Sequence, residues 1–276
     1  ELLANKQFDQ AIGLLNTGYD KTANQQIMRL RSEVQIAAGK PEDAIAALEA
    51  MDEKKKDESI HLLLAKAYVA KKDLESAKKT LRDSIMEDKT RTQSYISLAG
   101  LHASENNMGQ AVSILEDGVN ANPDDIRLRL SLAGFYERAG DVESAIKQYE
   151  KILSSNPDNL LANNNMAALL SDHRKDEASL KRAKEIADRL KNVNQPVILD
   201  TVGWVYYKTG NYIDAVSVLE KVVASQPDVP VFNFHLGMAY HKSGNNAEAK
   251  KFLEAALATD KEFQGRDIAE TTLKSL

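Results

Sequence analysis

The chain has 276 residues, of which 43% are hydrophobic and 28% are charged, a balance that excludes an intrinsically disordered protein. Charged residues interrupt every apolar stretch well before the ~20 residues that cross a bilayer, so no transmembrane segment is expected. The formal net charge of −5 argues against nucleic acid as a partner, since phosphate contacts need a basic face, and the absence of cysteine excludes disulfides and thiolate metal sites.

Small residues recur along the chain at a nearly constant interval. They are separated by 34 residues except for one interval of 36, and they are Ala65, Ala99, Ala133, Ala167, Gly203 and Gly237. In most of these units an alanine follows twelve residues later, at Ala77, Ala111, Ala145, Ala215 and Ala249. If the first small residue is repeat position 8, position 11 is tyrosine in four units, position 15 is glycine in three and position 32 is proline in three. The chain is therefore an internal repeat of 34 residues.

Each repeat is predicted to form two antiparallel helices. The small residue at position 8 lets the alanine at position 20 of the second helix approach closely, and the large residue at position 11 fills the volume beside it. Glycine at position 15 ends the first helix, and proline at position 32 ends the linker after the second. We therefore expect an all-α fold. In chain order the predicted units are a partial repeat at 1–24, full repeats at 25–57, 58–91, 92–125, 126–159, 160–195, 196–229 and 230–263, and a final helix at 264–276.

Both ends of the array and one repeat depart from the regular pattern. Phe8, Ala11 and Leu15 occupy second-helix positions, so the partial repeat is expected to lack most of its first helix and the chain to be a fragment of a longer array. The repeat 160–195 has two additional residues, and we expect the segment SDHRKDEASLKR, residues 171–182, to form a longer turn.

The segment 264–276 is predicted to be a solvating cap helix. It places Ile268, Thr272 and Leu273 on one face with polar residues opposite. Because a stack of repeats needs such a cap at a free end, the carboxyl end of the array is expected to be present.

The positions of these residues resemble the tetratricopeptide repeat, whose pattern is W-x2-L-G-x2-Y, a turn, A-x3-F and a closing proline. The resemblance covers almost the whole chain. It implies a right-handed α-solenoid in which the first helices line a concave groove, with repeat positions 2, 5, 6, 9, 12 and 13 facing it. It also implies a scaffold that binds a protein or peptide segment.

An aromatic cluster falls on the groove positions of the last two repeats. Trp204, Tyr207 and Lys208 occupy positions 9, 12 and 13 of one repeat, and Phe234 and Met238 occupy positions 5 and 9 of the next. Aromatic residues and methionine are enriched at protein interfaces, so this cluster is predicted to contact a partner. The alternative is that Trp204 only packs against the neighbouring helix.

A polar series follows repeat position 6. It comprises Ser97, Ser131, Asn165, Thr201 and His235, with Asn164 beside it at position 5. Each side chain can form a hydrogen bond, and the family resemblance implies a ladder that holds an extended peptide through its main chain. Small polar residues also fit these positions simply because they leave room. The basic residues of the groove are scattered, which argues against the family's carboxylate clamp.

No catalytic or metal-binding motif is found. GLLNTG, residues 13–18, has the glycine spacing of a phosphate loop, but Tyr19 and Asp20 stand where lysine and serine or threonine are required. His235 and His241 are six residues apart, on poorly matched faces of a helix for one metal ion. We therefore predict that the protein is not an enzyme and has no cofactor or metal.

The last third of the chain carries a narrower resemblance. The strings LLANNNMAALLSD, VILDTVGWVYYKTGNY and EFQGRDIAETTLKSL resemble the final repeats of bacterial secreted or lipid-anchored tetratricopeptide proteins associated with exopolysaccharide production and exosortase (PEP-CTERM) sorting. This resemblance implies a periplasmic or envelope-associated scaffold, and a cytoplasmic one remains the alternative. Two other functions stay open: a structural scaffold that self-associates, and a polysaccharide-binding module in which Trp204 and Tyr207 stack on sugar rings.

Overall fold

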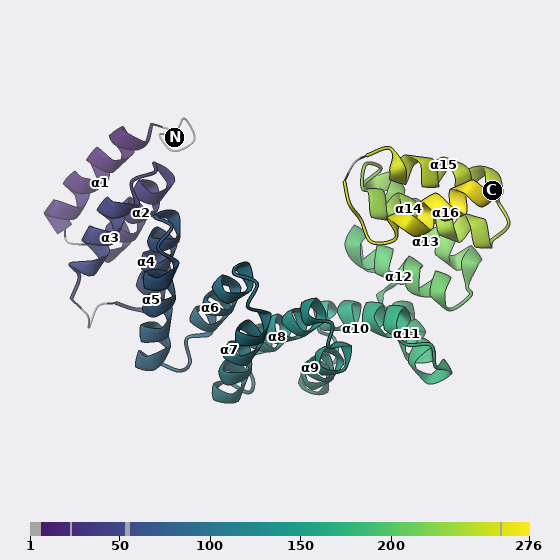
Figure 1. Ribbon diagram of the computed structural model, residues 1–276, viewed down its shortest axis with the longest axis horizontal. Coiled ribbons are helices and arrows are strands. Elements are labelled where there is room, and N and C mark those ends of the chain that lie inside the picture. Colours follow the sequence, from purple (N-terminus) through teal and green to yellow (C-terminus); the bar gives the residue numbers. More distant parts are fainter. Residues whose placement is uncertain (1–6, 23, 53–55, 260) are drawn as a thin grey trace. The chain divides into compact units, whose positions relative to one another are not determined.

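The computed structural model describes residues 7–22, 24–52, 56–259 and 261–276 (Figure 1). Over these residues the regular structure consists of α-helices, without strands. The chain forms two compact units, Glu1–Asp141 and Val142–Leu276. None of the helices in the described ranges combines the length and apolar composition that a bilayer crossing requires. The expected all-α class is confirmed.

The first unit contains eight of the described helices. They are α1 (Phe8–Thr22), α2 (Gln25–Ala37), α3 (Pro41–Glu49), α4 (Glu58–Ala70), α5 (Leu74–Glu87), α6 (Thr92–Ser104), α7 (Met108–Ala121) and α8 (Ile126–Ala139). Consecutive helices pack against each other, and the first helices of successive pairs, α2, α4, α6 and α8, also contact one another. This is the packing of a solenoid built from helix pairs.

The second unit repeats the same arrangement. Its helices are α9 (Val142–Ser155), α10 (Leu160–His173), α11 (Glu177–Leu190), α12 (Pro196–Lys208), α13 (Tyr212–Ser225), α14 (Pro230–Lys242), α15 (Asn246–Leu257) and α16 (Arg266–Ser275). The first helices α10, α12 and α14 contact one another in order, and α16 packs against α14 and α15. Helix α16 therefore packs where a further first helix would lie.

Local side-chain chemistry sets the helix ends. Asp125 begins α8 by accepting hydrogen bonds from the backbone N–H groups of Arg127 and Leu128, at 2.8 and 3.2 Å. The residue at repeat position 15 adopts the left-handed conformation after six first helices, and these residues are Gly39, Lys72, Asn106, Gly140, Gly210 and Gly244. The turn geometry is thus constant, although only four of the six residues are glycine.

Position 8 is small for a reason that differs from the prediction. A Cβ atom on Gly203 would lie 2.4 Å from Leu219 Cγ, and one on Gly237 would lie 2.8 Å from Leu253 Cγ. The close neighbour is therefore the leucine at position 24 of the second helix, not the alanine at position 20. The alanines at position 20 are fully buried, and they are small because the closely packed interior leaves no room for a larger side chain.

Prolines at position 32 are held by a side chain from the helix that follows. Asn163 Nδ2 donates to the carbonyl oxygen of Pro157 at 2.8 Å, and Asn233 Nδ2 donates to that of Pro227 at 2.7 Å. Both asparagines are buried, at 5% and 3% exposure. These bonds satisfy the amide groups of two buried asparagines and tie each linker to the helix that follows it.

Two sequence-based expectations are wrong in detail. The segment 171–182 is mostly helical, because α10 continues to His173 and α11 begins at Glu177. α11 has 14 residues, as α9 and α13 have, and its first fully buried alanine is Ala183. In the cap helix Ile268 is 48% exposed, and the buried face is centred on Ala269.

Candidate functional site

The aromatic residues of α12 and α14 lie together. The ring of Trp204 stacks with that of Tyr207, with centroids 4.6 Å apart, and with that of His235, at 4.1 Å. The indole Nε1 donates a hydrogen bond to Asp172 Oδ1 on α10 at 2.9 Å. The same oxygen lies 3.2 Å from Lys208 Nζ, which is 5.3 Å from the Trp204 ring centroid. Three first helices thus meet at one tryptophan.

Phe234 and Met238, also predicted site residues, lie deeper. They are 2% and 6% exposed, and they form a core cluster with Ala269 of α16. Phe263 contacts the Phe234 ring, with centroids 5.7 Å apart. The segment that leads into α16 therefore covers most of the surface of these side chains, and they form the buried core next to the aromatic cluster.

A cleft of about 400 Å³ opens beside Trp204. Its walls come from α10, α12 and α14, from the segment before α16 and from the first turn of α16. We call it the Trp204 cleft. It is lined by Ala168, Asp172, His173, Asp200, Thr201, Trp204, Lys208, Val231, Phe234, His235, Gln264, Gly265, Asp267 and Ile268. This size falls in the range of ligand-binding clefts in proteins.

A second acidic residue lies within the cleft. Asp200 faces the His235 ring, and Nδ1 of the histidine is 2.8 and 3.0 Å from the two carboxylate oxygens. Their side chains are 11% and 12% exposed. Asp200 is at repeat position 5, on the predicted groove face, but its pairing with His235 arises only when α12 and α14 pack together.

The polar series at position 6 is largely bonded within the protein. Asn165 Nδ2 donates to the Tyr149 hydroxyl at 3.0 Å, and its Oδ1 accepts from Asn164 Nδ2 at 3.1 Å. The hydroxyl of Thr201 donates to the Val197 carbonyl oxygen on its own helix, at 3.3 Å. Ser131 is partly buried on α8, in the first unit. In the second unit these side chains therefore already have hydrogen-bond partners within the protein.

Large apolar side chains at repeat position 2 are exposed on first helices that also form the walls of the cleft. Leu161 on α10 is 56% exposed and Val197 on α12 is 63% exposed. Val231, the equivalent residue on α14, lines the cleft itself. We call these three residues the apolar row. The signal for it was in the sequence, as an aliphatic residue at the same position of three consecutive repeats.

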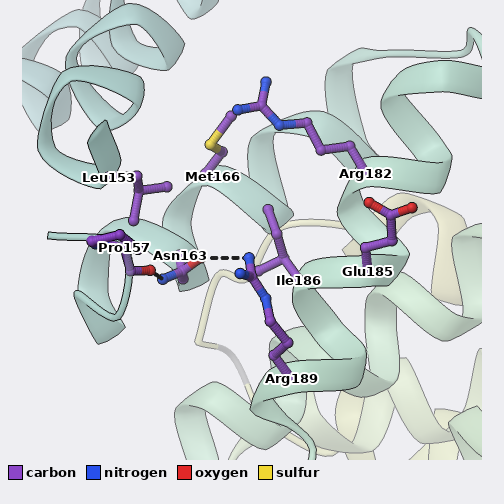
Figure 2. A pocket seen from close by; sticks show the side chains of 8 residues that line it. All are labelled: Leu153, Pro157, Asn163, Met166, Arg182, Glu185, Ile186 and Arg189. Carbon is purple, nitrogen blue, oxygen red and sulfur yellow. Dashed lines mark hydrogen bonds between the residues drawn. The ribbon is translucent and has the colours of Figure 1, made fainter. Parts of the chain in front are cut away.

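A second cleft of about 370 Å³ lies between α9, α10 and α11, and Figure 2 shows its lining. Arg189 Nη2 donates to Asn163 Oδ1 at 3.2 Å, the contact drawn toward Arg189 in the figure. Arg182 pairs with Glu150 on α9 at 2.7 Å. Both arginines are thus already used to join neighbouring elements. No group of three metal-ligating side chains occurs in the described part of the chain.

Comparison with known proteins shows the fold. No curated protein matches the chain. A tetratricopeptide repeat protein from Parabacteroides merdae has 14% identity and a TM-score of 0.60, covering 96% of this chain and 98% of that one. Yeast Tom70 has 16% identity and a TM-score of 0.57, covering 99% and 59%. YrrB, described as a TPR protein with an unusual peptide-binding site, has 18% identity and a TM-score of 0.54, covering 72% and 100%.

A match to a family model shows which family the sequence belongs to. The tetratricopeptide repeat model matches residues 35–101, 102–172 and 206–266, which is more than half of the chain. The matched segments carry five of the six repeated small residues, all except Gly203. The chain belongs to the tetratricopeptide repeat family.

Proposed function

We propose that this chain is a non-catalytic scaffold that binds a segment of a partner protein on the face formed by α10, α12 and α14. The tetratricopeptide fold is that of a protein–protein interaction scaffold. The solved YrrB structure, similar in fold, is described as having a peptide-binding site, although that description concerns YrrB alone. The location on this face is our inference from the residues that follow.

The observation that carries the proposal is the apolar row on the three helices that also form the Trp204 cleft. Leu161 and Val197 expose more than half of their surface, at 56% and 63%. Exposed aliphatic side chains beside a cleft that also offers polar groups are typical of binding surfaces. A segment lying across the three first helices would bury the row and place one side chain in the cleft.

The arrangement of Trp204 favours a protein segment over a polysaccharide. A sugar-binding platform presents an open aromatic face, whereas two rings already stack on this indole. Its N–H group is also bonded, to Asp172. The cleft also offers aliphatic and carboxylate groups, which match amino-acid side chains better.

Selection from a random peptide library displayed on phage, with the chain immobilised, tests this proposal. Peptides selected on the parent should lose affinity for a Leu161→Ser, Val197→Ser double variant by about thirtyfold, because each of the two buried aliphatic side chains contributes about 1 kcal/mol. Ile213→Ser is the matched control, since Ile213 is 82% exposed on α13 and lies outside the cleft lining. Equal loss in the control variant, or no loss in the double variant, would contradict the proposed surface.

The two alternative functions give different outcomes in the same set of measurements. A self-associating scaffold would show a sedimentation coefficient that rises with concentration, and no selected peptide would depend on Leu161 or Val197. A polysaccharide-binding module would retain soluble glycans in affinity electrophoresis, and Trp204→Ala would abolish the retention. If either of these results is obtained and no peptide binds, the corresponding alternative function replaces the proposal.

We also propose an envelope setting, as the last third of the sequence suggests through its resemblance to secreted and lipid-anchored tetratricopeptide proteins. The partner would then belong to an envelope or secretion assembly. Fractionation of the source organism with an antibody against this chain tests the setting. Recovery in the cytoplasmic fraction alone would contradict it and leave the binding surface unaffected.

A further inference from the structure

We propose that the side chain taken up by the Trp204 cleft is cationic, an arginine or lysine of the bound partner segment. This inference rests on the proposed function, because it specifies the chemistry of the segment that the same face binds. The apolar row would contact neighbouring aliphatic side chains of the segment. The argument depends on the charges, the acceptor atoms and the apolar wall of the cleft.

The cleft carries an excess of negative charge. Its lining includes three carboxylates, Asp172, Asp200 and Asp267, but one ammonium group, that of Lys208. Counting the carboxylates and the ammonium group alone, three negative charges and one positive charge leave a net charge of −2. Carboxylates in a partly dehydrated cleft are stabilised by a cation, so a positive side chain complements this site and a negative one does not.

Acceptor atoms remain for a ligand. The contacts of Asp172 with Trp204 Nε1 and Lys208 Nζ both go to Oδ1, at 2.9 and 3.2 Å, which leaves Oδ2 outside these two bonds. Each oxygen of Asp200 faces one histidine nitrogen and retains further lone-pair capacity. Asp267 adds an exposed carboxylate in the first turn of α16. Arginine or lysine supplies the several donors that such a set accepts.

The protein already holds one cation in this way. The Lys208 ammonium lies 3.2 Å from Asp172 Oδ1 and 5.3 Å from the Trp204 ring centroid, so a carboxylate and an aromatic ring stabilise it together. Val231, Phe234 and Ile268 form the apolar part of the lining. That part suits the methylene groups of a long basic side chain, whose charged end would face the carboxylates.

The first test uses synthetic peptides that differ only at one central residue. Fluorescein-labelled ten-residue peptides of alternating leucine and serine carry arginine, lysine, citrulline, glutamine or glutamate at the centre, and fluorescence anisotropy gives the Kd. We expect the arginine and lysine peptides to bind about fivefold tighter than citrulline and glutamine, and glutamate to bind most weakly. The advantage should shrink as salt is raised, because screening weakens charge pairs.

Substitutions in the cleft should then change the peptide affinity in a direction that depends on the charge of the ligand. For the arginine peptide, Asp172→Asn and Asp267→Asn should each weaken binding about threefold, whereas Lys208→Met should strengthen it about threefold by removing a competing cation. Asp214→Asn is the matched control, because Asp214 is an exposed aspartate in the first turn of α13 and is absent from the cleft lining. Lys221→Met, on the same helix, is the control for the lysine. Circular dichroism verifies that each variant is folded.

The outcomes separate this inference from the proposed function. If all five peptides bind equally and binding is lost in the Leu161→Ser, Val197→Ser variant, the scaffold function stands and the cationic ligand is wrong. If the glutamate peptide binds best and Lys208→Met weakens its binding, the cleft takes an anion and the inference is overturned. If no peptide binds at any salt concentration, both the function and the inference fall.

Discussion

The Tyr206 hydroxyl on α12 donates a hydrogen bond to Asp188 on α11 at 2.8 Å, and so joins one helix pair to the next. The same contact recurs between Tyr240 and Glu220 and, in the first unit, between Tyr136 and Glu116 and between Tyr68 and Glu49. In each case the tyrosine at repeat position 11 reaches an acid on the second helix of the preceding pair. The packing residue predicted from the sequence therefore also carries a bond between repeats.

These bonds predict a loss of stability in alkali. Burial, followed by the hydrogen bond to Glu49 and its charge, raises the pKa of Tyr68 from 10.0 to about 12. Burial and the neighbouring acid likewise raise the pKa of Tyr136, Tyr206 and Tyr240. A phenol with a raised pKa stabilises the fold fully below its unfolded-state pKa. The free energy of unfolding should accordingly fall as the pH rises from 10 to 12.

Urea unfolding at a series of pH values measures this fall. Tyr68→Phe should be less stable than the parent below pH 10 and should lose less stability between pH 10 and 12, because it has no proton to release. Glu49→Gln keeps an acceptor but removes the charge, and it should give an intermediate slope. An unchanged slope in Tyr68→Phe would show that this tyrosine does not contribute to the pH dependence.

Two helical glycines should respond in opposite directions to the same substitution. A Cβ on Gly203 would lie 2.4 Å from Leu219 Cγ, so Gly203→Ala should destabilise the protein by about 2 kcal/mol. A Cβ on Gly134, inside α8, would meet nothing within 4 Å. Gly134→Ala should therefore stabilise it by about 1 kcal/mol, because alanine favours the helix. Chemical denaturation monitored by circular dichroism distinguishes the two, and equal signs would contradict this account.

Lys72 is in a conformation that suits glycine. Its φ is 66°, at the same repeat position where Gly140 has a φ of 79°. A side chain in the left-handed region costs about 1 kcal/mol, so Lys72→Gly should raise the midpoint of thermal unfolding. Lys71→Gly is the adjacent control: φ there is −74°, and glycine should lower the midpoint through its greater flexibility in the unfolded chain. A decrease in both variants would refute the strain at Lys72.

The bond from Trp204 to Asp172 can be tested by stability alone. Asp172→Ala leaves the indole N–H without its acceptor, which should lower the free energy of unfolding by about 1 kcal/mol. Asp172→Asn retains an oxygen acceptor and should cost less. Because Trp204 is the single tryptophan of the chain, its fluorescence reports unfolding of this region specifically. Equal stability of the alanine variant and the parent would mean that water replaces the bond without loss.

The sequence alone determined the architecture, because each contact between helices requires a residue of a particular size at the same position of every repeat. Ala133 and Gly203 recur at the position where two helices come close, and Gly140 at the position where the chain must turn, so helix pairs and their order follow from spacing. Trp204 and Tyr207 were identified as a cluster for the same reason, since their repeat positions differ from those of the packing residues.

Only the tertiary structure decided which of these side chains are free to meet a ligand. Met238 shares a predicted groove position, but it is 6% exposed and packs in a core cluster with Ala269 of α16, and the extent of that cover depends on how a helix packs across its neighbours. Asp172, Asp200 and Asp267 are separated by up to 95 residues along the chain and line one cleft because α10, α12 and α16 bring them together. A single repeat period does not encode such proximity, because it arises from the packing of different residues in successive repeats.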